Sequence, residues 1–280
     1  SYAFHHLESI KAVLGRTPSG LITDVDGTIS PAAPTPQQAR VSPACHAYLT
    51  KLCNQMALVA AISGRPALEV KNMININGMV YVGNHGLERW AEGHSEPRQE
   101  VQDYPGIIKS VIEELSPLLT VEGIIVENKG ITASIHYRLA SEPEATRGLI
   151  LKAIASSEAA SELRILEGRR VVDLRPPLAV DKGIAVLDVV QRYQLRGAIY
   201  LGDDITDVDA FVALRRGPEG IPFDGLSVAV IVEEIQPEVI EKADLVLHGV
   251  TEVERFLGWL LAATSGLNSQ YPGFVDRATQ

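Results

Sequence analysis

The chain has 280 residues, of which 46% are hydrophobic and 21% are charged, and its formal net charge is −10. This length can bury a good core in one large or two modest domains, and the acidic balance argues against a nucleic-acid surface, which needs a basic stripe. It does not exclude an anionic small molecule as substrate, because a metal ion and a few local cations can outweigh the overall charge.

No export or membrane segment is predicted. The first residues lack the long apolar core of a signal peptide, and the apolar run at 256–263 is too short to span a bilayer. Cys45 and Cys53 stand eight residues apart on a predicted helix, where they cannot easily pair, so we expect two thiols and a reducing compartment. We expect a cytoplasmic monomer that binds neither membrane nor nucleic acid.

The N-terminal part of the chain alternates apolar runs with helices. Continuous apolar runs are typical of parallel strands buried on both faces, and they occur at 20–24, 56–62 and 79–82. Helices are expected over 3–14, over 43–55 and after Pro66. This repetition predicts a doubly wound, Rossmann-like α/β core with a parallel sheet.

The pattern changes near residue 97 to one typical of a small antiparallel sheet. Helices are expected over 104–119 and 142–159, and strands over 123–127, 131–138, 163–167 and 170–174. In the second strand Ala133, Ile135 and Tyr137 alternate with polar residues, which indicates one apolar face. We expect an inserted α+β cap domain over 98–176, with the core domain at 1–97 and 177–280.

After Pro176 and Pro177 the α/β pattern returns. A helix is expected over 181–193, strands over 197–201, 226–231 and 244–247, and a last helix over 250–263. We expect the final dozen residues to be poorly ordered.

Polar side chains stand where the predicted core strands end or the next helix begins. They are Asp24 and Asp26, Ser63, Lys182, and then Asp203, Asp204 and Asp207. Because the carboxyl ends of parallel strands meet at one edge of the sheet, we expect these groups to lie together. Phosphoryl transfer needs a nucleophile, an acid/base, donors for phosphate oxygens and a cation. Clustered carboxylates with few nitrogen or sulfur neighbours suit Mg²⁺.

Each of these residues also has a simpler interpretation. Ser63 could be a plain helix N-cap, Lys182 a solvated first-turn residue, and Asp204 and Asp207 caps of the next helix. Their order along the chain, each at a strand end or a helix start, favours the phosphoryl-transfer interpretation.

The order of these motifs resembles that of the haloacid dehalogenase superfamily of phosphatases, and the insertion resembles its α/β cap. More narrowly, the chain is similar to the trehalose-6-phosphate phosphatase family over about residues 18–262. The residues that carry the narrower resemblance are 63–65, 83–88, 127–129, 136–138, 167–169, 174–176 and 202–211.

The resemblance implies catalytic roles. Asp24 would attack phosphorus and form an aspartyl phosphate. Asp26 would protonate the leaving sugar oxygen and then activate the hydrolytic water. Ser63 and Lys182 would hold the phosphate, and Lys182 would also restrain the Asp24 carboxylate.

The resemblance also implies a magnesium site. Asp24, the carbonyl of Asp26 and Asp203 would hold the ion. Asp207 or Asp204 would lie in the same shell or behind it.

In the cap, the resemblance assigns Glu127, Lys129 and Glu167 to the sugar hydroxyls. Further candidate substrate contacts are Arg65, Asn84, His85, His136 and Arg138. His85 has an equal alternative as a hydrogen-bonded structural histidine, and His136 as part of a solvated sheet face.

One position departs from the family pattern. Relatives usually carry Glu where Val208 stands, which leaves metal binding intact but weakens the assignment of the sugar. We expect a Mg²⁺-dependent phosphatase that hydrolyses trehalose 6-phosphate. The alternatives are another sugar-phosphate phosphatase, acting on sucrose phosphate or a glycosyl phosphoglycerate, and a non-catalytic sugar-phosphate sensor.

Overall fold

The computed structural model describes residues 1–91, 93–233 and 235–268. The chain divides into two compact units. One combines Ser1–Ser95 with the stretch that begins at Val180, and the other is Glu96–Ala179. We call them the core unit and the cap unit.

The core unit is built on an eight-stranded sheet with the order β12-β11-β10-β1-β2-β3-β4-β5. Neighbours from β12 to β3 are parallel, and β4 is antiparallel to β3. The strands are β1 (Ser19–Thr23), β2 (Leu58–Ile62), β3 (Val80–Gly83), β4 (Glu88–Ala91), β5 (His94–Pro97), β10 (Gly197–Gly202), β11 (Asp224–Ile231) and β12 (Leu245–His248). Every residue of β1, β2 and β10 is buried, which explains why these strands lack polar alternation.

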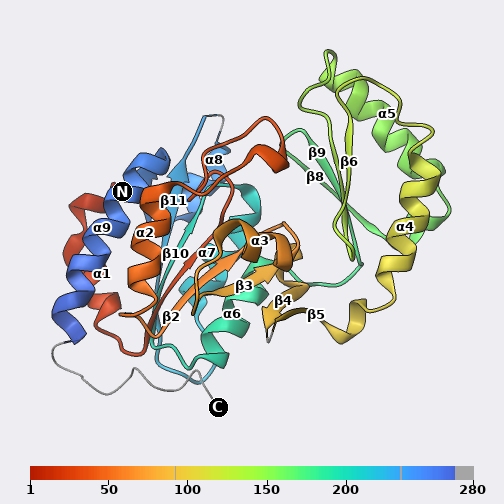
Figure 1. Cartoon of the computed structure of the whole chain (residues 1–280). Helices are drawn as coiled ribbons and strands as arrows, with labels where there is room; N and C mark the ends of the chain where they lie inside the picture. Colours follow the sequence, from red (N-terminus) through yellow and green to blue (C-terminus); the bar gives the residue numbers. More distant parts are fainter. Residues whose placement is uncertain (92, 234, 269–280) are drawn as a thin grey trace. The chain divides into compact units, whose positions relative to one another are not determined.

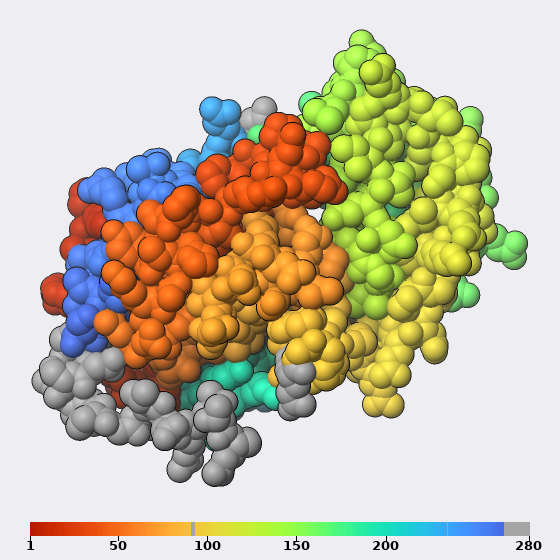
Figure 2. All heavy atoms as spheres, in the orientation of Figure 1, coloured from red at the N-terminus to blue at the C-terminus, as the bar shows by residue number. Residues whose placement is uncertain are grey.

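Helices cover both faces of this sheet (Figure 1). Their bounds are α1 (Leu7–Leu14), α2 (Pro43–Leu52), α3 (Ala67–Ile74), α6 (Lys182–Arg192), α7 (Ile205–Arg216), α8 (Pro237–Lys242) and α9 (Gly249–Asn268). One apolar cluster joins the sheet to α1, α2, α3 and α9, and a second joins its other face to α6, α7 and α8. In Figure 2, α2, α3 and the loop before α2, in orange shades, cover much of the visible side of the core unit.

The chain moves outward from β1 in both directions, to β2 and β3 on one side and to β10, β11 and β12 on the other. β1 pairs with β10 in a register that sets Thr23 opposite Leu201. In open α/β sheets, ligands bind beyond the carboxyl ends of the strands where the strand order reverses. That point lies here at the ends of β1 and β10.

The cap unit is a four-stranded antiparallel sheet with the order β6-β7-β9-β8. Its strands are β6 (Ile125–Asn128), β7 (Ala133–His136), β8 (Arg164–Gly168) and β9 (Val171–Arg175). The helices α4 (Tyr104–Leu115) and α5 (Pro143–Ser156) lie on the same side of this sheet and enclose its apolar core (Figure 1). The predicted fold class is confirmed: a doubly wound parallel core and an inserted α+β cap.

Three local predictions differ from the structure. The helix expected over 3–14 is divided into a 3₁₀ turn, Ala3–His5, and α1, because the first residues are attached to the edge strand β12 through a hydrogen bond from Val246 N to Ser1 O. Strands β4 and β5 were not predicted, since these half-exposed strands carry no apolar run. The last helix is longer than expected, and the expectation for the final dozen residues lies outside the described residues.

The two cysteines are free thiols, as predicted. Cys45 is buried on α2, and Cys53 is half-buried just after it. Among the helices of the described ranges, none has both the length and the apolar character needed to cross a membrane.

Candidate active site

The ends of β1 and β10 bring two acids to the same edge of the core sheet. Asp24 follows β1 directly, and its backbone N–H donates to the carbonyl of Leu201 at 2.8 Å, so the strand pairing continues one residue further. Asp203 follows β10 directly. Both carboxylates therefore stand at the switch point of the fold.

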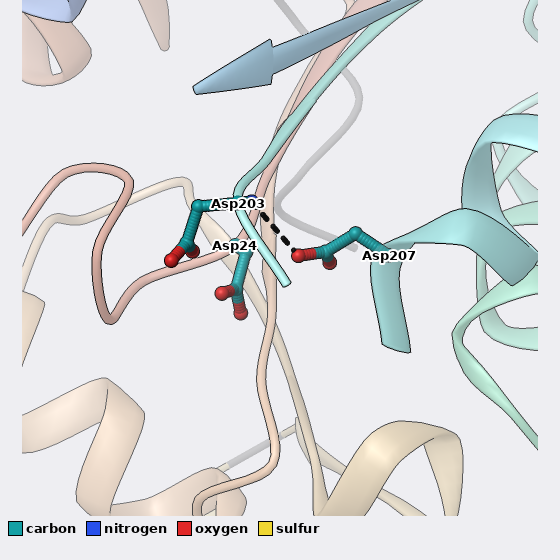
Figure 3. Close-up of side chains that lie close together, drawn as sticks. All are labelled: Asp24, Asp203 and Asp207. Atoms are coloured by element: carbon teal, nitrogen blue, oxygen red, sulfur yellow. Dashed lines mark hydrogen bonds between the residues drawn. The ribbon is translucent and has the colours of Figure 1, made fainter. Parts of the chain in front are cut away.

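Asp24, Asp203 and Asp207 form a carboxylate cluster, with one oxygen of each within 4.8 Å of the others. Figure 3 shows Asp24 and Asp203 projecting from neighbouring chain segments and Asp207 approaching from α7. The Thr28 hydroxyl donates to Asp203 Oδ1 at 3.0 Å. Gly27 has φ +86°, and a Cβ there would lie 2.1 Å from Asp203 Oδ2, so the turn after Asp26 leaves room for this carboxylate only with glycine.

Lys182 joins two members of the cluster. Its ammonium lies 2.9 Å from Asp24 Oδ1 and 2.7 Å from Asp207 Oδ1, and its side chain is only 3% exposed. Lys182 is the first residue of α6, whose N-cap Asp181 accepts from Ile184 N at 2.9 Å. The capped helix start thus fixes Lys182 against Asp24.

Asp207 is a fully used acceptor. Oδ1 accepts from Lys182 and from the Tyr200 hydroxyl, both at 2.7 Å. Oδ2 accepts from the backbone N–H groups of Asp203 and Asp204, both at 3.0 Å. Four donors leave little capacity for a direct metal bond, so Asp207 is built to support its neighbours.

Asp204 has a different position from the other acids. It is the N-cap of α7, and its Oδ1 accepts from Ile205 N at 2.7 Å. It is not a member of the carboxylate cluster, which among the described residues contains only Asp24, Asp203 and Asp207. Asp204 therefore matches the capping interpretation. Val208, on the next turn, is buried in the apolar cluster with Tyr200.

The cluster carries more negative charge than Lys182 can balance. Burial raises the pKa of Asp24 to about 7; Lys182 opposes this rise, while Asp207 and Asp26 add to it. Burial and the neighbouring Asp24 and Asp207 also raise the pKa of Asp203 well above its usual value. Although burial disfavours a charged lysine, the two carboxylates outweigh it and raise the pKa of Lys182. Three acids and one fixed cation leave an excess of negative charge, which a divalent cation would neutralise.

Asp26 is held by an arginine rather than by the cluster. Arg65 Nε and Nη2 donate to Asp26 Oδ2 and Oδ1 at 2.7 and 2.8 Å. Ser63, in the turn after β2, is buried and accepts from Arg65 N at 3.2 Å, so its hydroxyl can still donate to a phosphate. The structure thus brings Asp26, Ser63 and Arg65 together at the ends of β1 and β2.

Asn84 and His85 follow β3 in a short turn that carries backbone strain. Their φ angles are +47° and +56°, in the left-handed region that costs a non-glycine residue free energy. Asn84 Nδ2 donates to Glu88 at 2.7 Å, and His85 N donates to the Ser63 carbonyl at 2.9 Å. The His85 ring lies against Gly64, where a Cβ would be 2.5 Å from Nε2. Both residues are buried, and their backbone N–H groups hold the turn at Ser63 and Arg65.

The cap sheet presents polar side chains on the face opposite α4 and α5. Glu127 stands opposite Ser134 and contacts a histidine and a lysine. Its Oε2 lies 2.7 Å from His136 Nε2 and 3.7 Å from Lys129 Nζ. Arg138 follows β7 and is exposed. The structure therefore brings Glu127, Lys129 and His136 together.

Glu167 does not share that face. It stands opposite Val172, a core residue of the cap, and forms an ion pair with Arg147 of α5 at 2.5 Å. Side chains alternate along a strand, so Glu167 points to the helix side of the sheet while Glu127 points away from it. The resemblance assigns both glutamates to the sugar hydroxyls, whereas in the structure they lie on opposite faces of the cap sheet.

Asp173 was missed by the sequence reasoning. It stands opposite Ser134 on β7, accepts from that hydroxyl at 2.5 Å and from Arg175 at 2.7 Å, and shares a face with Glu127. The alternation of Val172, Asp173 and Leu174 contains the signal, because the two apolar neighbours are buried in the cap core.

Comparison with solved structures identifies the fold. A haloacid dehalogenase-like hydrolase from Bacteroides thetaiotaomicron superposes with a TM-score of 0.61 at 14% identity, over 86% of this chain and 99% of that chain. The C-terminal domain of trehalose-6-phosphate phosphatase from C. albicans superposes with a TM-score of 0.70 at 19% identity, over 90% of this chain and 96% of that chain. The fold is thus that of the haloacid dehalogenase-like hydrolases.

Within that class, the chain belongs to the trehalose-phosphatase family, whose model matches residues 22–242. The trehalose-phosphate phosphatase of Mycobacterium avium (strain 104) is 34% identical over 216 residues, which are 74% of this chain and 54% of that protein. The corresponding protein of Mycobacterium tuberculosis (strain H37Rv) is 33% identical over 206 residues, 71% of this chain and 51% of its own length. The chain spans about half the length of these curated relatives.

Proposed function

We propose that this chain hydrolyses trehalose 6-phosphate to trehalose and phosphate with the help of Mg²⁺. The observation that carries the proposal is the contact of Lys182 with Asp24 at 2.9 Å beside the Asp203 carboxylate. A nucleophile held by a buried cation next to further acids is the arrangement that phosphoryl transfer requires. The sugar assignment rests on membership of the family.

The donor set suits magnesium. The clustered side chains offer carboxylate oxygens, without sulfur or nitrogen ligands among the three residues, which is the preference of this hard cation. Asp24, Asp203 and the backbone carbonyl of Asp26 would hold the ion, and Asp207 would stand behind them. When bound, Mg²⁺ would neutralise charge on the phosphoryl oxygens.

The chain's own residues account for the remaining steps. Asp24 attacks phosphorus and forms an aspartyl phosphate, while Lys182 fixes its carboxylate and offers charge to the phosphoryl group. Asp26 donates a proton to the leaving sugar oxygen and later accepts one from the attacking water. The Ser63 hydroxyl donates to a phosphoryl oxygen, whereas the first N–H of α3, on Ala67, already donates to Glu88 at 2.9 Å.

We further propose that the polar face of the cap sheet binds the sugar. Glu127, Lys129 and His136 combine acceptors and donors on one face, and hydroxyl groups need both. Asp173 adds an acceptor to that face. The cytoplasmic location and the monomeric state stay predictions.

The test is phosphate release from a panel of sugar phosphates. The panel contains trehalose 6-phosphate, sucrose phosphate, a glycosyl phosphoglycerate and glucose 6-phosphate, each with Mg²⁺ and with a chelator. We expect release from trehalose 6-phosphate at the highest kcat/KM, and none in chelator. Faster release from another member would reassign the sugar. Binding without release from any member would instead favour the sensor.

A further inference from the structure

The side chain of Arg65 has no role in the mechanism above, although it contacts one of its acids. Arg65 lies in the turn between β2 and α3, and its backbone is fixed from two sides. Its N–H donates to Ser63 Oγ at 3.2 Å, and its carbonyl accepts from Asn84 N at 2.8 Å. The backbone from which the Arg65 side chain extends is therefore held in place.

The guanidinium has already used most of its donors inside the core unit. Besides the two bonds to Asp26, Nη2 donates to the carbonyl of Pro36 at 3.0 Å and Nη1 to the carboxylate of Glu69. Its side chain is only 8% exposed. A guanidinium that binds phosphate uses a free pair of parallel N–H groups. In Arg65 the pair on Nε and Nη2 already donates to Asp26 and is not free for a phosphate.

Asp26, in contrast to Arg65, has an exposed side chain with few partners. Its side chain is 44% exposed, and within the described ranges its only hydrogen bonds and ion pair are those to Arg65. A carboxylate exposed to this degree has several rotamers open to it unless a partner selects one. Two parallel bonds from a planar guanidinium fix the position of both oxygens and the plane of the group, which a lysine cannot do.

We propose that Arg65 is a positioning residue for Asp26 and not a ligand of the substrate. Two hydrogen bonds, to the carbonyl of Pro36 and to Glu69 of α3, anchor the guanidinium independently of Asp26. Its two bonds to Asp26 then hold the half-exposed carboxylate in one orientation. The role rests on the proposed function, in which Asp26 moves a proton at the leaving oxygen. General acid–base catalysis requires hydrogen-bond reach and contributes roughly 10²- to 10⁴-fold, so a loosely held Asp26 loses much of it.

The test is a double-mutant cycle with Arg65→Lys, Asp26→Asn and the combined variant. We expect Arg65→Lys to lower kcat for trehalose 6-phosphate by roughly 10- to 10²-fold, part of the general acid–base contribution, with KM nearly unchanged. In the Asp26→Asn background the same substitution should cost less than about twofold, because a residue that acts only through Asp26 has nothing left to position.

Two further variants keep the test decisive. Glu69→Gln removes one charge beside the guanidinium, on the side away from Asp26, while its amide oxygen can still accept from Arg65. It should lower kcat far less than Arg65→Lys does. Arg65→Met removes the positive charge and both hydrogen bonds to Asp26. Thermal denaturation shows whether each variant folds. A raised KM, or a full Arg65→Lys loss that persists in the Asp26→Asn background, would overturn the proposal in favour of substrate binding. Unchanged kcat in folded Arg65→Lys or Arg65→Met would overturn it as well.

The same cycle on p-nitrophenyl phosphate separates this idea from the proposed function. If the wild type hydrolyses this ester but not trehalose 6-phosphate, the sugar assignment fails while the cycle still reports on Arg65. If the wild type hydrolyses both and the Arg65 and Asp26 effects simply multiply, the positioning role fails and the phosphatase assignment stands.

Discussion

Lys182 is the residue on which the geometry of the site depends most. Its buried ammonium contacts Asp24 and Asp207, so it connects the end of β1 with the start of α7 through α6. Removing one partner of a buried charge pair leaves the other uncompensated, so we expect substitutions that delete these side chains to destabilise the fold. The amide analogue of Asp24 is the gentlest probe of its role.

At the residue scale we predict that Asp24→Asn folds normally and loses nearly all turnover. The amide keeps the shape of the carboxylate and can still accept from Lys182, but it cannot attack phosphorus. Phosphate release and a thermal unfolding curve measure the two halves of the prediction. A folded variant with more than about a hundredth of the wild-type kcat would show that Asp24 is not the covalent nucleophile.

At the scale of elements, the two-residue repeat of the cap strands decides which polar groups can meet a ligand. Glu127 on β6 and Asp173 on β9 both stand opposite Ser134 of β7, so they lie on the same face of the cap sheet. Glu167 on β8 lies on the other face, beside Arg147. Two glutamates that are equally polar in the sequence are therefore expected to differ in function.

We predict that Glu127→Gln and Lys129→Ala each lower kcat/KM for trehalose 6-phosphate by roughly 10²-fold, on the scale of about 3 kcal/mol for charged hydrogen bonds to the sugar. Hydrolysis of p-nitrophenyl phosphate should barely change, because this ester has no sugar hydroxyls. Steady-state kinetics on both substrates measure the effect.

Glu167→Ala is the matched control, since it removes a glutamate of the same sheet from the helix-facing side. It should reduce kcat/KM for neither substrate by more than a few-fold. A selective loss in Glu167→Ala, with none in Glu127→Gln, would contradict the assignment of the two faces. A parallel loss of both substrates would point to a role in folding of the cap unit.

At the scale of the whole molecule, the fold gathers acids at the switch point of a chain that is already strongly acidic, with net charge −10. The effect on the acids is seen in the pKa values of Asp24 and Asp203. Both are raised, mainly by burial and additionally by neighbouring carboxylates. A raised carboxyl pKa in the folded state favours the protonated acid there. Its contribution to stability is therefore complete below the ordinary pKa of 3.8 and is lost as the pH rises through about 7.

We predict that the melting temperature of the metal-free protein falls between about pH 5 and pH 8 through these groups, and that Mg²⁺ offsets the fall. The stabilisation by Mg²⁺ should accordingly be larger at the higher pH, where the ion replaces protons on the acids. Thermal unfolding in chelator and in Mg²⁺ at both pH values measures this. Asp203→Asn should abolish most of the difference; an equal Mg²⁺ effect at both pH values would contradict the prediction.

The sequence by itself determined the architecture and the edge of the core sheet where the candidate site lies. Strands buried on both faces, such as β1 and β2, must be continuous apolar runs, and a parallel order brings the residues after them to one edge. Asp24 and Asp203 were predicted for this reason, and Lys182 was predicted because it opens the helix that follows the cap. The strands β4 and β5 carry no such run, and nothing local distinguishes them from a polar loop.

Only the tertiary structure decided what each polar side chain touches. Asp204 and Asp207 form one capping box at the start of α7, yet Asp207 also accepts from Lys182 and Tyr200. Arg65 is remote from Asp26 along the chain and becomes its partner because β1 and β2 are neighbours. Strand periodicity is a local property that the chain encodes within a few residues. A hydrogen bond between distant groups depends on how two elements pack, and no local pattern specifies that.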